Sequence, residues 1–363
     1  MKVLVILPRG LDVVKWREEF DNGNVPDETP YGYHHAEKYG CTVDFSAATI
    51  TPTGLTGFLD RGLRRLLGFD IRHIWLNRHR IFNQTYDVIW THTEYEHLAI
   101  LALSKLMCSG RAPLIAQSIW LMDDWAEYSQ PRRWFYKLLM SQAEVATFHS
   151  PENTAMAKRL KLSSRVELMH FGVSLDSFPL KAPRARVAAG RRVRVLALGN
   201  DKHRDWLTFS SAFGGRENFE VRIGSCKFPQ NLKSRNFEIG PMSQSEIRLA
   251  YEWADCVVVP LKRNVHVSGL TTLLESIAMG VPVVVTDVGG LRDYFSDECV
   301  RYVKPLDAIT LGKEVQKIVE NPEQSFKKAI AAQRRIQEIN LTSCGFAERH
   351  VHLSQSMLKN ITY

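Results

Sequence analysis

The sequence predicts an α/β protein made of two doubly wound domains, each with a mainly parallel sheet between layers of helices. Three observations support this prediction. Short β-branched runs alternate with helical patterns in both halves of the chain, several runs are apolar on both faces, and residues 181–194 show neither pattern. Strands separated by helices favour parallel pairing, and parallel strands between helix layers are apolar on both faces. A chain of 363 residues can hold two such domains.

The first domain is predicted over residues 1–180 and begins with the strand VLVILP. Pro8 and Gly10 interrupt this apolar run too early for a signal peptide, so we interpret it as a strand. A long loop is expected next, and then a helix that starts near Pro30. The later elements are expected to be strands at 43–46, 86–92, 113–119 and 143–150, a basic helical segment at 59–80 and an apolar helix at 98–107.

The segment 181–194 carries basic and small residues but no acidic residue, and it is predicted to be the linker. The second domain is predicted over residues 195–340, where the alternation starts again. Its strands are expected at 192–199, 219–225, 236–240, 255–261, 281–286 and 299–303. Its helices are expected at 205–213, 243–254, 270–279 and 308–320, and a further helical stretch covers 323–358.

The composition indicates a soluble globular protein with an anionic partner. The chain is 45% hydrophobic and 24% charged, and its formal net charge is +8. No apolar run reaches the roughly 18 to 20 residues that cross a bilayer. The six cysteines show no metal-ligand spacing, so we expect neither disulfides nor zinc and a reducing cytoplasm. Nucleic acid is not the expected partner, because no helix-turn-helix, zinc finger or RNA-binding aromatic set is present.

A basic cluster at 59–80 is the main charged feature of the first domain. Its cationic members are Arg61, Arg64, Arg65, Arg72, Arg78 and Arg80. Its apolar members are Leu59, Leu63, Leu66, Leu67, Phe69, Ile74 and Trp75. Spacings of three and four residues give a helix one apolar and one cationic face, as on anionic lipid surfaces. A surface helix that packs its apolar side on the domain has the same pattern, so both interpretations stay open. Residues 131–140 repeat the pattern more weakly.

The stretch NVHVSGLTTLLESIAMGVPVVVTDVGG, residues 264–290, carries the most specific motif. Ser268 and Gly269 precede an apolar helix, so free amides and the positive end of the helix dipole would converge there on a diphosphate. Glu275 lies deeper in this helix and would accept hydrogen bonds from ribose hydroxyls. Gly280 ends the helix, and the strand that follows is apolar on both faces. The pattern predicts a site for a sugar nucleotide.

This stretch resembles the donor-binding segment of the GT-B glycosyltransferases, in particular the retaining enzymes called group 1 or family 4. The family motif is Glu-x7-Glu, followed by a Gly-x-Pro-Val-Val strand and a terminal Gly-Gly. Here Glu275 matches the second Glu, whereas Val267 stands at the position of the first. The resemblance implies the GT-B fold, with two Rossmann-like domains facing a cleft and a C-terminal helix at 341–363 that packs back on the first domain. The first Glu of the family lies against the donor sugar, so its absence bears on sugar choice and stereochemistry.

The resemblance also implies cations at the end of the first strand of the second domain, where they neutralise charge on the leaving diphosphate. Asn200 replaces the usual first cation, and Lys202 and Arg204 are the available pair. Arg204 is the stronger candidate, because a guanidinium forks onto phosphate oxygens. The remaining donor-binding candidates are Gly10, His266, Ser268, Gly269, Leu270, Thr271 and Glu275. Backbone groups near Gly224 and Met242 are expected to contact the base.

Catalytic candidates lie where strands of the first domain end, and they are His92, Glu94 and Asp123. One of them would act as the base if the reaction inverts configuration. Retention needs no such base, because the leaving phosphate itself can take the acceptor proton. Asp123 and Asp124 are adjacent, and the metal-binding Asp-x-Asp motif belongs to another glycosyltransferase fold. No metal site is therefore predicted.

The sequence therefore predicts a glycosyltransferase of the hexosyltransferase type that is retaining and metal-independent. Its co-substrate is a nucleotide diphosphate sugar, and no other cofactor is expected. Its acceptor is a glycan of cell-envelope or polysaccharide assembly, with a lipid-linked acceptor as one form. The enzyme is expected in the cytoplasm, peripheral to an anionic inner membrane surface. The alternatives are an inverting enzyme, a UDP-N-acetylhexosamine epimerase and a non-catalytic nucleotide-sugar-binding protein.

Overall fold

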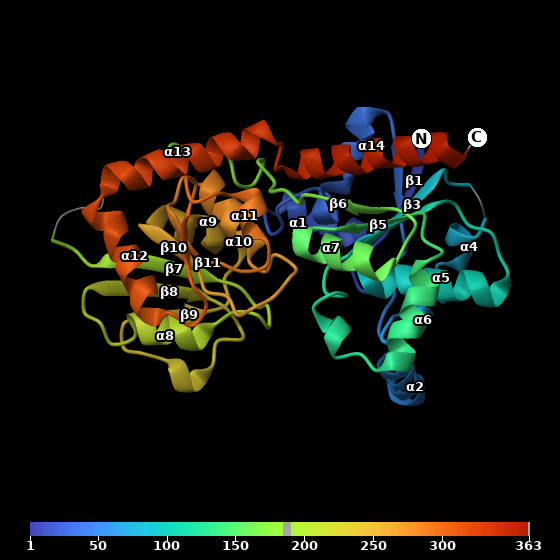
Figure 1. The fold of residues 1–363 in the computed structure, drawn as a ribbon, viewed down its shortest axis with the longest axis horizontal. Helices are drawn as coiled ribbons and strands as arrows, with labels where there is room; N and C mark the ends of the chain where they lie inside the picture. The colour runs from blue at the N-terminus through green and yellow to red at the C-terminus, as the bar shows by residue number, and fades with distance from the viewer. Residues whose placement is uncertain (84, 184–189, 362–363) are drawn as a thin grey trace. The chain divides into compact units, whose positions relative to one another are not determined.

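The chain forms two compact units, which are shown in the computed structural model of Figure 1. The structure describes residues 1–83, 85–183 and 190–361. Unit 1 comprises Met1–Asp21, Asp27–His170 and Ser343–Tyr363, and unit 2 comprises Asn22–Pro26 and Phe171–Thr342. The predicted linker at 181–194 includes residues 184–189, which lie outside the described residues.

Unit 1 is built on a six-stranded parallel sheet with the order β2-β1-β3-β4-β5-β6. Its strands are β1 (Lys2–Ile6), β2 (Thr42–Phe45), β3 (Val88–Thr91), β4 (Leu114–Ser118), β5 (Val145–Phe148) and β6 (Val166–Leu168). Its helices are α1 (Val13–Asp21), α2 (Gly54–Leu67), α3 (Ile71–Leu76), α4 (Arg78–Ile81), α5 (Glu94–Met107), α6 (Gln130–Met140), α7 (Pro151–Leu160) and α14 (Ser343–Ile361). Two short 3-10 helices are η1 (Pro30–Tyr39) and η2 (Asp124–Ala126). Every residue of β3, β4 and β5 is buried, as expected of central parallel strands.

One prediction for the segment after β1 is wrong, and a second is correct in position but not in helix type. The predicted long loop contains the helix α1, and the helix predicted near Pro30 is the 3-10 helix η1. Tyr31 and Gly32 interrupt η1 with positive φ angles of 63° and 72°. A Cβ on Gly32 would lie 2.6 Å from the Cβ of Ser343, so α14 can begin against η1 only because residue 32 is a glycine. Close packing of η1 and α14 thus selects the irregular backbone (Figure 1).

Unit 2 is also built on a six-stranded parallel sheet, with the order β12-β11-β10-β7-β8-β9. Its strands are β7 (Val193–Leu198), β8 (Phe219–Gly224), β9 (Phe237–Gly240), β10 (Cys256–Val259), β11 (Val283–Thr286) and β12 (Arg301–Val303). Its helices are α8 (Trp206–Phe213), η3 (Gln230–Leu232), α9 (Gln244–Trp253), α10 (Leu270–Ala278), α11 (Leu291–Tyr294), α12 (Ala308–Glu320) and α13 (Pro322–Glu338). One apolar core joins the sheet to α9, α10, α11 and α13, and a second joins its other face to α8 and α12.

The helical stretch predicted over residues 323–358 is divided between α13 and α14. Asn340 has a positive φ angle of 49°, and Leu341 is fully buried. The amide of Val173 donates to the carbonyl of Leu341 at 3.0 Å, and Val173 forms a β-bridge with Thr342. The chain leaves the helical conformation here because residues 341 and 342 pair with the segment around Val173.

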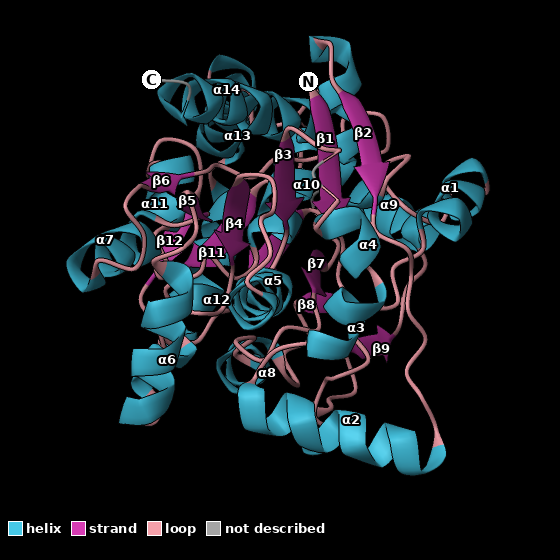
Figure 2. Cartoon of the chain, turned by 90° about the vertical axis from the view of Figure 1, so that its right-hand side faces the viewer, coloured by secondary structure: helices cyan, strands magenta, loops and turns pink. Residues whose placement is uncertain are grey.

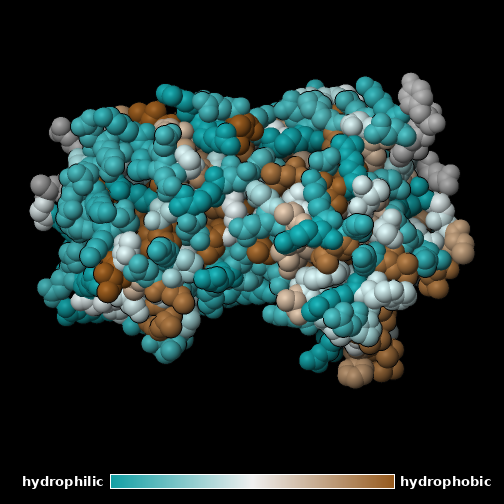
Figure 3. Space-filling view, in the orientation of Figure 1, coloured by the Kyte–Doolittle hydropathy of each residue, from teal (hydrophilic) through white to brown (hydrophobic). Residues whose placement is uncertain are grey.

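Helix α2 lies at the edge of unit 1 and leaves most of its residues exposed to solvent (Figure 2). Only Gly57 and Asp60 of this helix are buried, whereas Phe58, Leu59 and Leu66 are 66%, 61% and 71% exposed. Figure 3 shows the resulting apolar surface at the lower right, where α2 lies. The interpretation that the apolar side of this helix packs on the domain is therefore wrong for α2. Among the described residues, no helix is both long and apolar enough to cross a bilayer.

Candidate functional site

The order of the strands in unit 2 brings two loops together. Strand β7 lies between β8 and β10, and the chain turns to opposite sides of the sheet after β7 and after β10. In open α/β sheets, ligands bind at the carboxyl ends of strands at such a switch point. The loop after β7 carries Arg204, and the loop after β10 leads through Ser268 into α10. The two segments predicted to form the donor site, around Arg204 and Ser268, are therefore neighbours in the fold.

The side chain of Arg204 connects these two loops. Its Nε donates to the carbonyl of Leu198 at 2.9 Å, and its Nη1 donates to the hydroxyl of Ser268 at 3.2 Å. Its Nη2 lies 3.4 Å from the hydroxyl of Thr272. Arg204 is only 6% exposed, and burial lowers the pKa of its guanidinium. No carboxylate of the described residues lies within ion-pair distance of it. Asp201, whose charge acts to raise the pKa of Arg204, is paired with His203 and His266 instead.

Two glycines make room for this guanidinium. A Cβ on Gly199 would lie 2.3 Å from the Nε of Arg204. A Cβ on Gly269 would lie 2.5 Å from Cγ1 of Val259 and 3.2 Å from Nη1 of Arg204. Gly269 also has a φ angle of +83°, which side chains rarely adopt. The Gly that precedes the apolar helix is therefore needed both for its backbone conformation and for the approach of Arg204.

The amino end of α10 offers free backbone donors, although not all those predicted. The amide of Ser268 is already bonded to Oδ1 of Asn264 at 3.1 Å, and the amide of Leu270 donates to the carbonyl of Val267. The amides of Gly269, Thr271 and Thr272 donate to no group in the part of the chain that the structure describes. The prediction of free amides is thus wrong for residue 268. It fits the first turn of α10, where the helix dipole also favours an anion.

Val267 occupies the position of the missing family Glu with a strained backbone. Its φ angle is +55°, which is a genuine outlier for a β-branched residue. Its side chain is 4% exposed and packs in the apolar core with Leu270. The turn is held by Asn264, whose amide donates to the carbonyl of Lys262 and whose Oδ1 accepts from Ser268. Here the turn carries a buried apolar side chain at residue 267 in place of a carboxylate.

A small polar cluster lies beside this turn, and sequence reasoning identified only one of its members. Asp201 accepts from the amide of His203 at 2.6 Å, and its carboxylate lies 3.1 Å from Nδ1 of His203 and 3.4 Å from Nε2 of His266. Burial opposes the charge of Asp201, but the hydrogen bonds from both histidines hold its pKa well below its usual range. His266, predicted to bind the donor, is thus oriented by Asp201, which no sequence motif singled out.

Glu275 is paired with a tyrosine of the neighbouring helix. Its Oε2 accepts a hydrogen bond of 2.8 Å from the hydroxyl of Tyr251 on α9. Burial raises the pKa of Glu275 to about 7, although the bond from Tyr251 acts in the opposite direction. Glu275 nevertheless keeps some exposed surface, in contrast to the fully buried Tyr251. The carboxylate is therefore poised to ionise when further hydrogen-bond donors reach it.

The other residues predicted in this site have different surroundings. Oδ1 of Asn200 accepts from the hydroxyl of Ser225 and from the amide of Cys226, so Asn200 connects the ends of β7 and β8. Lys202 and Thr271 are exposed. Gly224 and Met242 are neighbours, because a Cβ on Gly224 would lie 3.0 Å from the sulfur of Met242. A cavity of about 270 Å³ lies beside Met242 and is also lined by Gly240, Pro241 and Ala250.

In unit 1, Gly10 and His92 follow the two strands at the switch point of the sheet, β1 and β3. Gly10 is exposed, and its neighbour Arg9 is bonded to Asp60 and Asp70. His92 is 3% exposed, and its Nδ1 lies 3.0 Å from the hydroxyl of Tyr33. Burial, together with His149 and His350, holds the pKa of His92 well below its usual range. His92 is thus a neutral, buried histidine of unit 1.

Glu94 is also buried and already bonded. Its Oε2 accepts from the amides of Ile119 at 3.1 Å and Trp120 at 3.4 Å. Burial raises the pKa of Glu94, although these two amides act in the opposite direction. Its Oε1 is buried and has no hydrogen-bond partner within the described ranges. Asp123 precedes the 3-10 helix η2 and is partly exposed. Unit 1 thus places the three predicted catalytic residues in distinct environments.

Comparisons with known proteins identify the fold and the class of enzyme. Residues 230–335 match the model of the family described as glycosyl transferases group 1. The chain is a glycosyltransferase with the GT-B fold. The predicted resemblance to group 1 is thereby confirmed, and the matched residues include Glu275 and the turn before α10. A comparison with curated protein sequences found no match.

Solved structures of glycosyltransferases share the fold over the full chain. Sucrose-phosphate synthase from Thermosynechococcus elongatus matches with a TM-score of 0.72 and 17% identity, over 99% of this chain and 100% of that one. A glycosyltransferase from Rickettsia africae matches with a TM-score of 0.67 and 13% identity, over 99% of each chain. HepE of Anabaena, solved in complex with UDP and glucose, matches with a TM-score of 0.65 and 12% identity, over 98% of this chain and 100% of that one.

Proposed function

We propose that this glycosyltransferase transfers a hexose from a nucleotide diphosphate sugar to a glycan acceptor of cell-envelope or polysaccharide assembly. One observation carries the proposal. The buried guanidinium of Arg204 has no acidic partner in the described chain, and it lies beside the free amides at the start of α10. A diphosphate supplies the ion-pair partner that Arg204 lacks. HepE was solved with UDP and with UDP-glucose, so UDP-glucose is the first donor to test.

The leaving group is the centre of the proposed reaction. The bond between the anomeric carbon and the diphosphate breaks, and the acceptor oxygen bonds to that carbon. Negative charge grows on the diphosphate during this step. Arg204 and the amides of Gly269, Thr271 and Thr272 are prearranged to stabilise this charge, which is the kind of interaction that accelerates transfer. Glu275 accepts hydrogen bonds from the ribose, with Tyr251 fixing its orientation.

We propose retention of configuration without a metal ion. In this route the acceptor proton passes to the leaving phosphate on the same face, so no protein base is required. The burial of His92 and Glu94 fits this route, since both already bond to neighbours in unit 1. Fixed cations and amides take the part that a metal plays in other transferases. The inverting alternative requires one of His92, Glu94 and Asp123 to reach an acceptor hydroxyl.

We further propose that the enzyme works in the cytoplasm at the inner face of a membrane. The exposed side chains of α2 support this, because Phe58, Leu59 and Leu66 form an apolar surface on the same helix as Arg61, Arg64 and Arg65. Apolar residues flanked by cations are suited to an anionic lipid interface. A lipid-linked acceptor would be presented at the same interface.

The test of the proposed function is substitution of Arg204. Release of nucleotide diphosphate is measured from UDP-glucose, UDP-N-acetylglucosamine and GDP-mannose, with and without membrane extract. We expect Arg204→Lys to lower kcat/KM about 100-fold, because the point charge remains but the forked contact is lost. The control is Arg235→Lys, an exposed arginine paired with Glu217 on the surface of unit 2. Equal rates for both variants would refute the proposal.

The outcome that would count against transfer is binding of nucleotide sugars without turnover, because Val267 replaces the carboxylate that the family places against the sugar. The same assay separates the two. Binding of UDP or GDP by calorimetry, combined with no release of product from any donor in the panel, supports the binding protein. Turnover that appears only with membrane extract supports the transferase.

A further inference from the structure

Helix α2 is attached to unit 1 by polar contacts rather than by its apolar side. Arg9 donates to both oxygens of Asp60, at 2.6 and 3.0 Å, and to Asp70 at 2.5 Å. At the other end of the helix, Arg132 donates to the carbonyl of Leu66 at 2.7 Å, and Tyr136 donates to that of Leu67 at 2.6 Å. These contacts hold α2 in place and leave its leucines and Phe58 facing solvent. These polar contacts therefore fix the position of the exposed apolar surface on unit 1.

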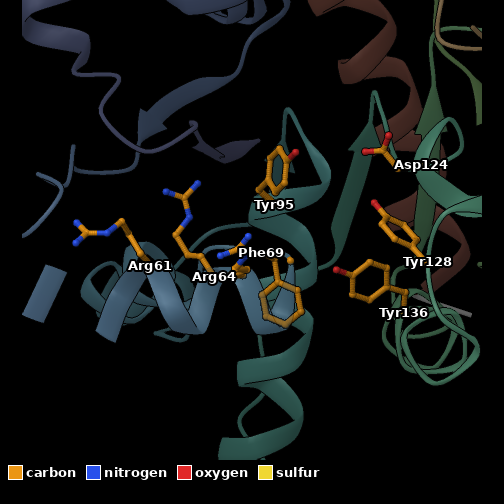
Figure 4. Close-up of a pocket in the computed structure, with 9 residues that line it drawn as sticks. Arg61, Arg64, Phe69, Tyr95, Asp124, Tyr128 and Tyr136 are labelled. Atoms are coloured by element: carbon orange, nitrogen blue, oxygen red, sulfur yellow. The ribbon is translucent and has the colours of Figure 1, made fainter. Parts of the chain in front are cut away.

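A cavity of about 440 Å³ opens beside the basic side of this helix (Figure 4). Arg61, Arg64 and Arg65 line it from α2, while Tyr95 stands on α5 and Tyr128 and Asp124 lie on the opposite side (Figure 4). The volume is within the range of roughly 300 to 1,000 Å³ that is usual for small-molecule sites. The cavity is therefore larger than a single bound ion requires.

The polar groups of the cavity are only partly used by the protein. Arg64 lies 3.7 Å from Asp70, whereas Arg61 and Arg65 have no acidic partner in the described parts of the chain. The hydroxyls of Tyr95 and Tyr128 also form no hydrogen bond with a described residue. Burial raises the pKa of Tyr95 to about 12, so this hydroxyl remains a donor near neutral pH. The cavity thus presents an excess of cations and donors, with one carboxylate, Asp124, at its rim.

We propose that this cavity binds the phosphate-bearing head group of a lipid whose hydrocarbon chain lies along the apolar surface of α2. The arginines match the phosphate in charge, and guanidinium groups bind phosphate through forked hydrogen bonds. Asp124 and the tyrosine hydroxyls suit the hydroxyls of a sugar attached to that phosphate. The exposed leucines of the same helix commit the occupant to a lipid, because a free sugar phosphate gains nothing from them. The inference rests on the proposed function in one respect, since it names the acceptor as a glycolipid phosphate.

The experiment measures binding of three soluble probes to the full chain by calorimetry, namely n-octyl phosphate, n-octyl glucoside and inorganic phosphate. Octyl phosphate carries both the chain and the charge, whereas each other probe carries only one of them. We expect octyl phosphate to bind at least about tenfold more tightly than either other probe. Binding of inorganic phosphate as tight as that of octyl phosphate would overturn the lipid assignment.

Matched variants locate the site. Arg61→Gln with Arg65→Gln is expected to weaken binding of octyl phosphate about tenfold. Lys158→Gln with Arg159→Gln removes the same charge from exposed positions of α7 and is expected to change it less than about twofold. Leu59→Gln with Leu66→Gln is expected to weaken it several-fold, and Leu106→Gln, exposed on α5, is the control. Equal losses in the α2 and α7 pairs would mean general charge attraction and would refute the site.

Nucleotide binding is measured on the same samples, so that the two proposals fail separately. The arginines of α2 lie in unit 1, whereas Arg204 and α10 lie in unit 2. UDP or GDP binding without octyl phosphate binding refutes the lipid cavity and leaves the proposed function intact. Octyl phosphate binding that depends on Arg61 and Arg65, in a protein that binds no nucleotide, refutes the proposed function and supports the cavity.

Discussion

Units 1 and 2 each place a six-stranded parallel sheet between helices. The polar groups at the switch points of the two sheets nevertheless differ in charge and in their hydrogen-bond partners. In unit 2, Arg204 is buried without an acidic partner, beside amides that donate to no described residue. In unit 1, His92 is bonded to Tyr33, and Glu94 is bonded to the backbone at residues 119 and 120. The order of the strands determines at which edge of a sheet a ligand can bind. Whether that edge is prepared for an anion depends on which polar groups the fold leaves without partners.

The same contrast separates two helices of similar pattern. Helix α10 in unit 2 buries Leu270, Leu273 and Leu274 in the main core of that unit. Helix α2 in unit 1 leaves Phe58 and Leu59 exposed and is held by charged side chains instead. An apolar stripe at helical spacing therefore marks a core in one unit and an external surface in the other.

The largest effect that would test the comparison of the units is their response to acid. Ten of the twelve histidines lie in unit 1. Burial lowers the pKa of His97 and of His350 to about 3. A neutral buried histidine stabilises the fold above its unfolded pKa of about 6.5, and this stability is lost as the pH falls below that value. Each such group is expected to cost unit 1 about 2 kcal/mol at pH 5.

Two buried carboxyl groups have the opposite effect on stability, because they stabilise the folded protein more as the pH falls. Burial raises the pKa of Glu96 in unit 1 to about 8 and that of Glu275 in unit 2 to about 7. A raised carboxyl pKa gives stability that is complete below the unfolded value and is lost as the pH rises through 7 to 8, so acid favours both groups. Unit 2 has only His203 and His266, which lie beside Asp201. We therefore expect unit 1 to lose stability before unit 2 between pH 7 and pH 5.

Native-state hydrogen exchange at peptide resolution, corrected for the intrinsic rate, measures both units in one sample. His97→Gln should reduce the pH dependence in unit 1. His79→Gln is the control, because His79 is exposed. Equal protection of both units at pH 5 would contradict this explanation.

The next effect concerns the two helices. Leu273→Ala on α10 is expected to destabilise the protein by about 2 to 5 kcal/mol, because the side chain is fully buried. Leu59→Ala on α2 is expected to change the free energy of unfolding by less than about 0.5 kcal/mol. It should nevertheless weaken binding to vesicles that contain phosphatidylglycerol. Denaturant titration and vesicle sedimentation test the pair, and a large loss of stability in the α2 variant would show that Leu59 is a core residue.

Glycine substitutions in the same helices give a smaller contrast. Gly269→Ala places a side chain at a φ angle of +83° and 2.5 Å from Cγ1 of Val259, so we expect a loss of about 2 kcal/mol and weaker nucleotide binding. Gly62 lies inside α2 with no heavy atom within 4 Å of the added Cβ. Gly62→Ala should therefore stabilise the protein by roughly 0.5 to 1 kcal/mol. Thermal unfolding measures both changes in stability. Destabilisation by Gly62→Ala would show that this side of α2 packs against another part of the protein.

The smallest expected effect is the pH dependence of nucleotide binding. Because the pKa of Glu275 is raised to about 7, hydrogen bonds from a ribose favour its ionised form and release a proton. Affinity for the nucleotide diphosphate should therefore rise several-fold between pH 6 and pH 8. Calorimetry in buffers of different ionisation enthalpy measures the proton release. Glu275→Gln should abolish it, whereas Glu298→Gln, on the surface, should retain it.

Much of unit 2 was predictable, because its strands are continuous apolar runs between helices of clear period. The helix predicted over 308–320 has the observed bounds of α12. The proximity of Arg204 to Ser268 could be inferred in the same way, since both loops follow strands that meet at the switch point. Segments governed by close packing were less predictable. The helix expected near Pro30 is a 3-10 helix, because α14 approaches residue 32.

The sequence by itself determined the parallel α/β architecture, the glycine-led entry into α10 and the absence of a family carboxylate at Val267, because these depend on local pattern and residue identity. Only the tertiary structure decided which amides of that turn are free, since Asn264 takes the amide of Ser268. It also decided that the apolar side of α2 faces outward. The periodicity of a helix shows that it has two faces, but the surrounding contacts, here Arg9 with Asp60, determine which face turns inward.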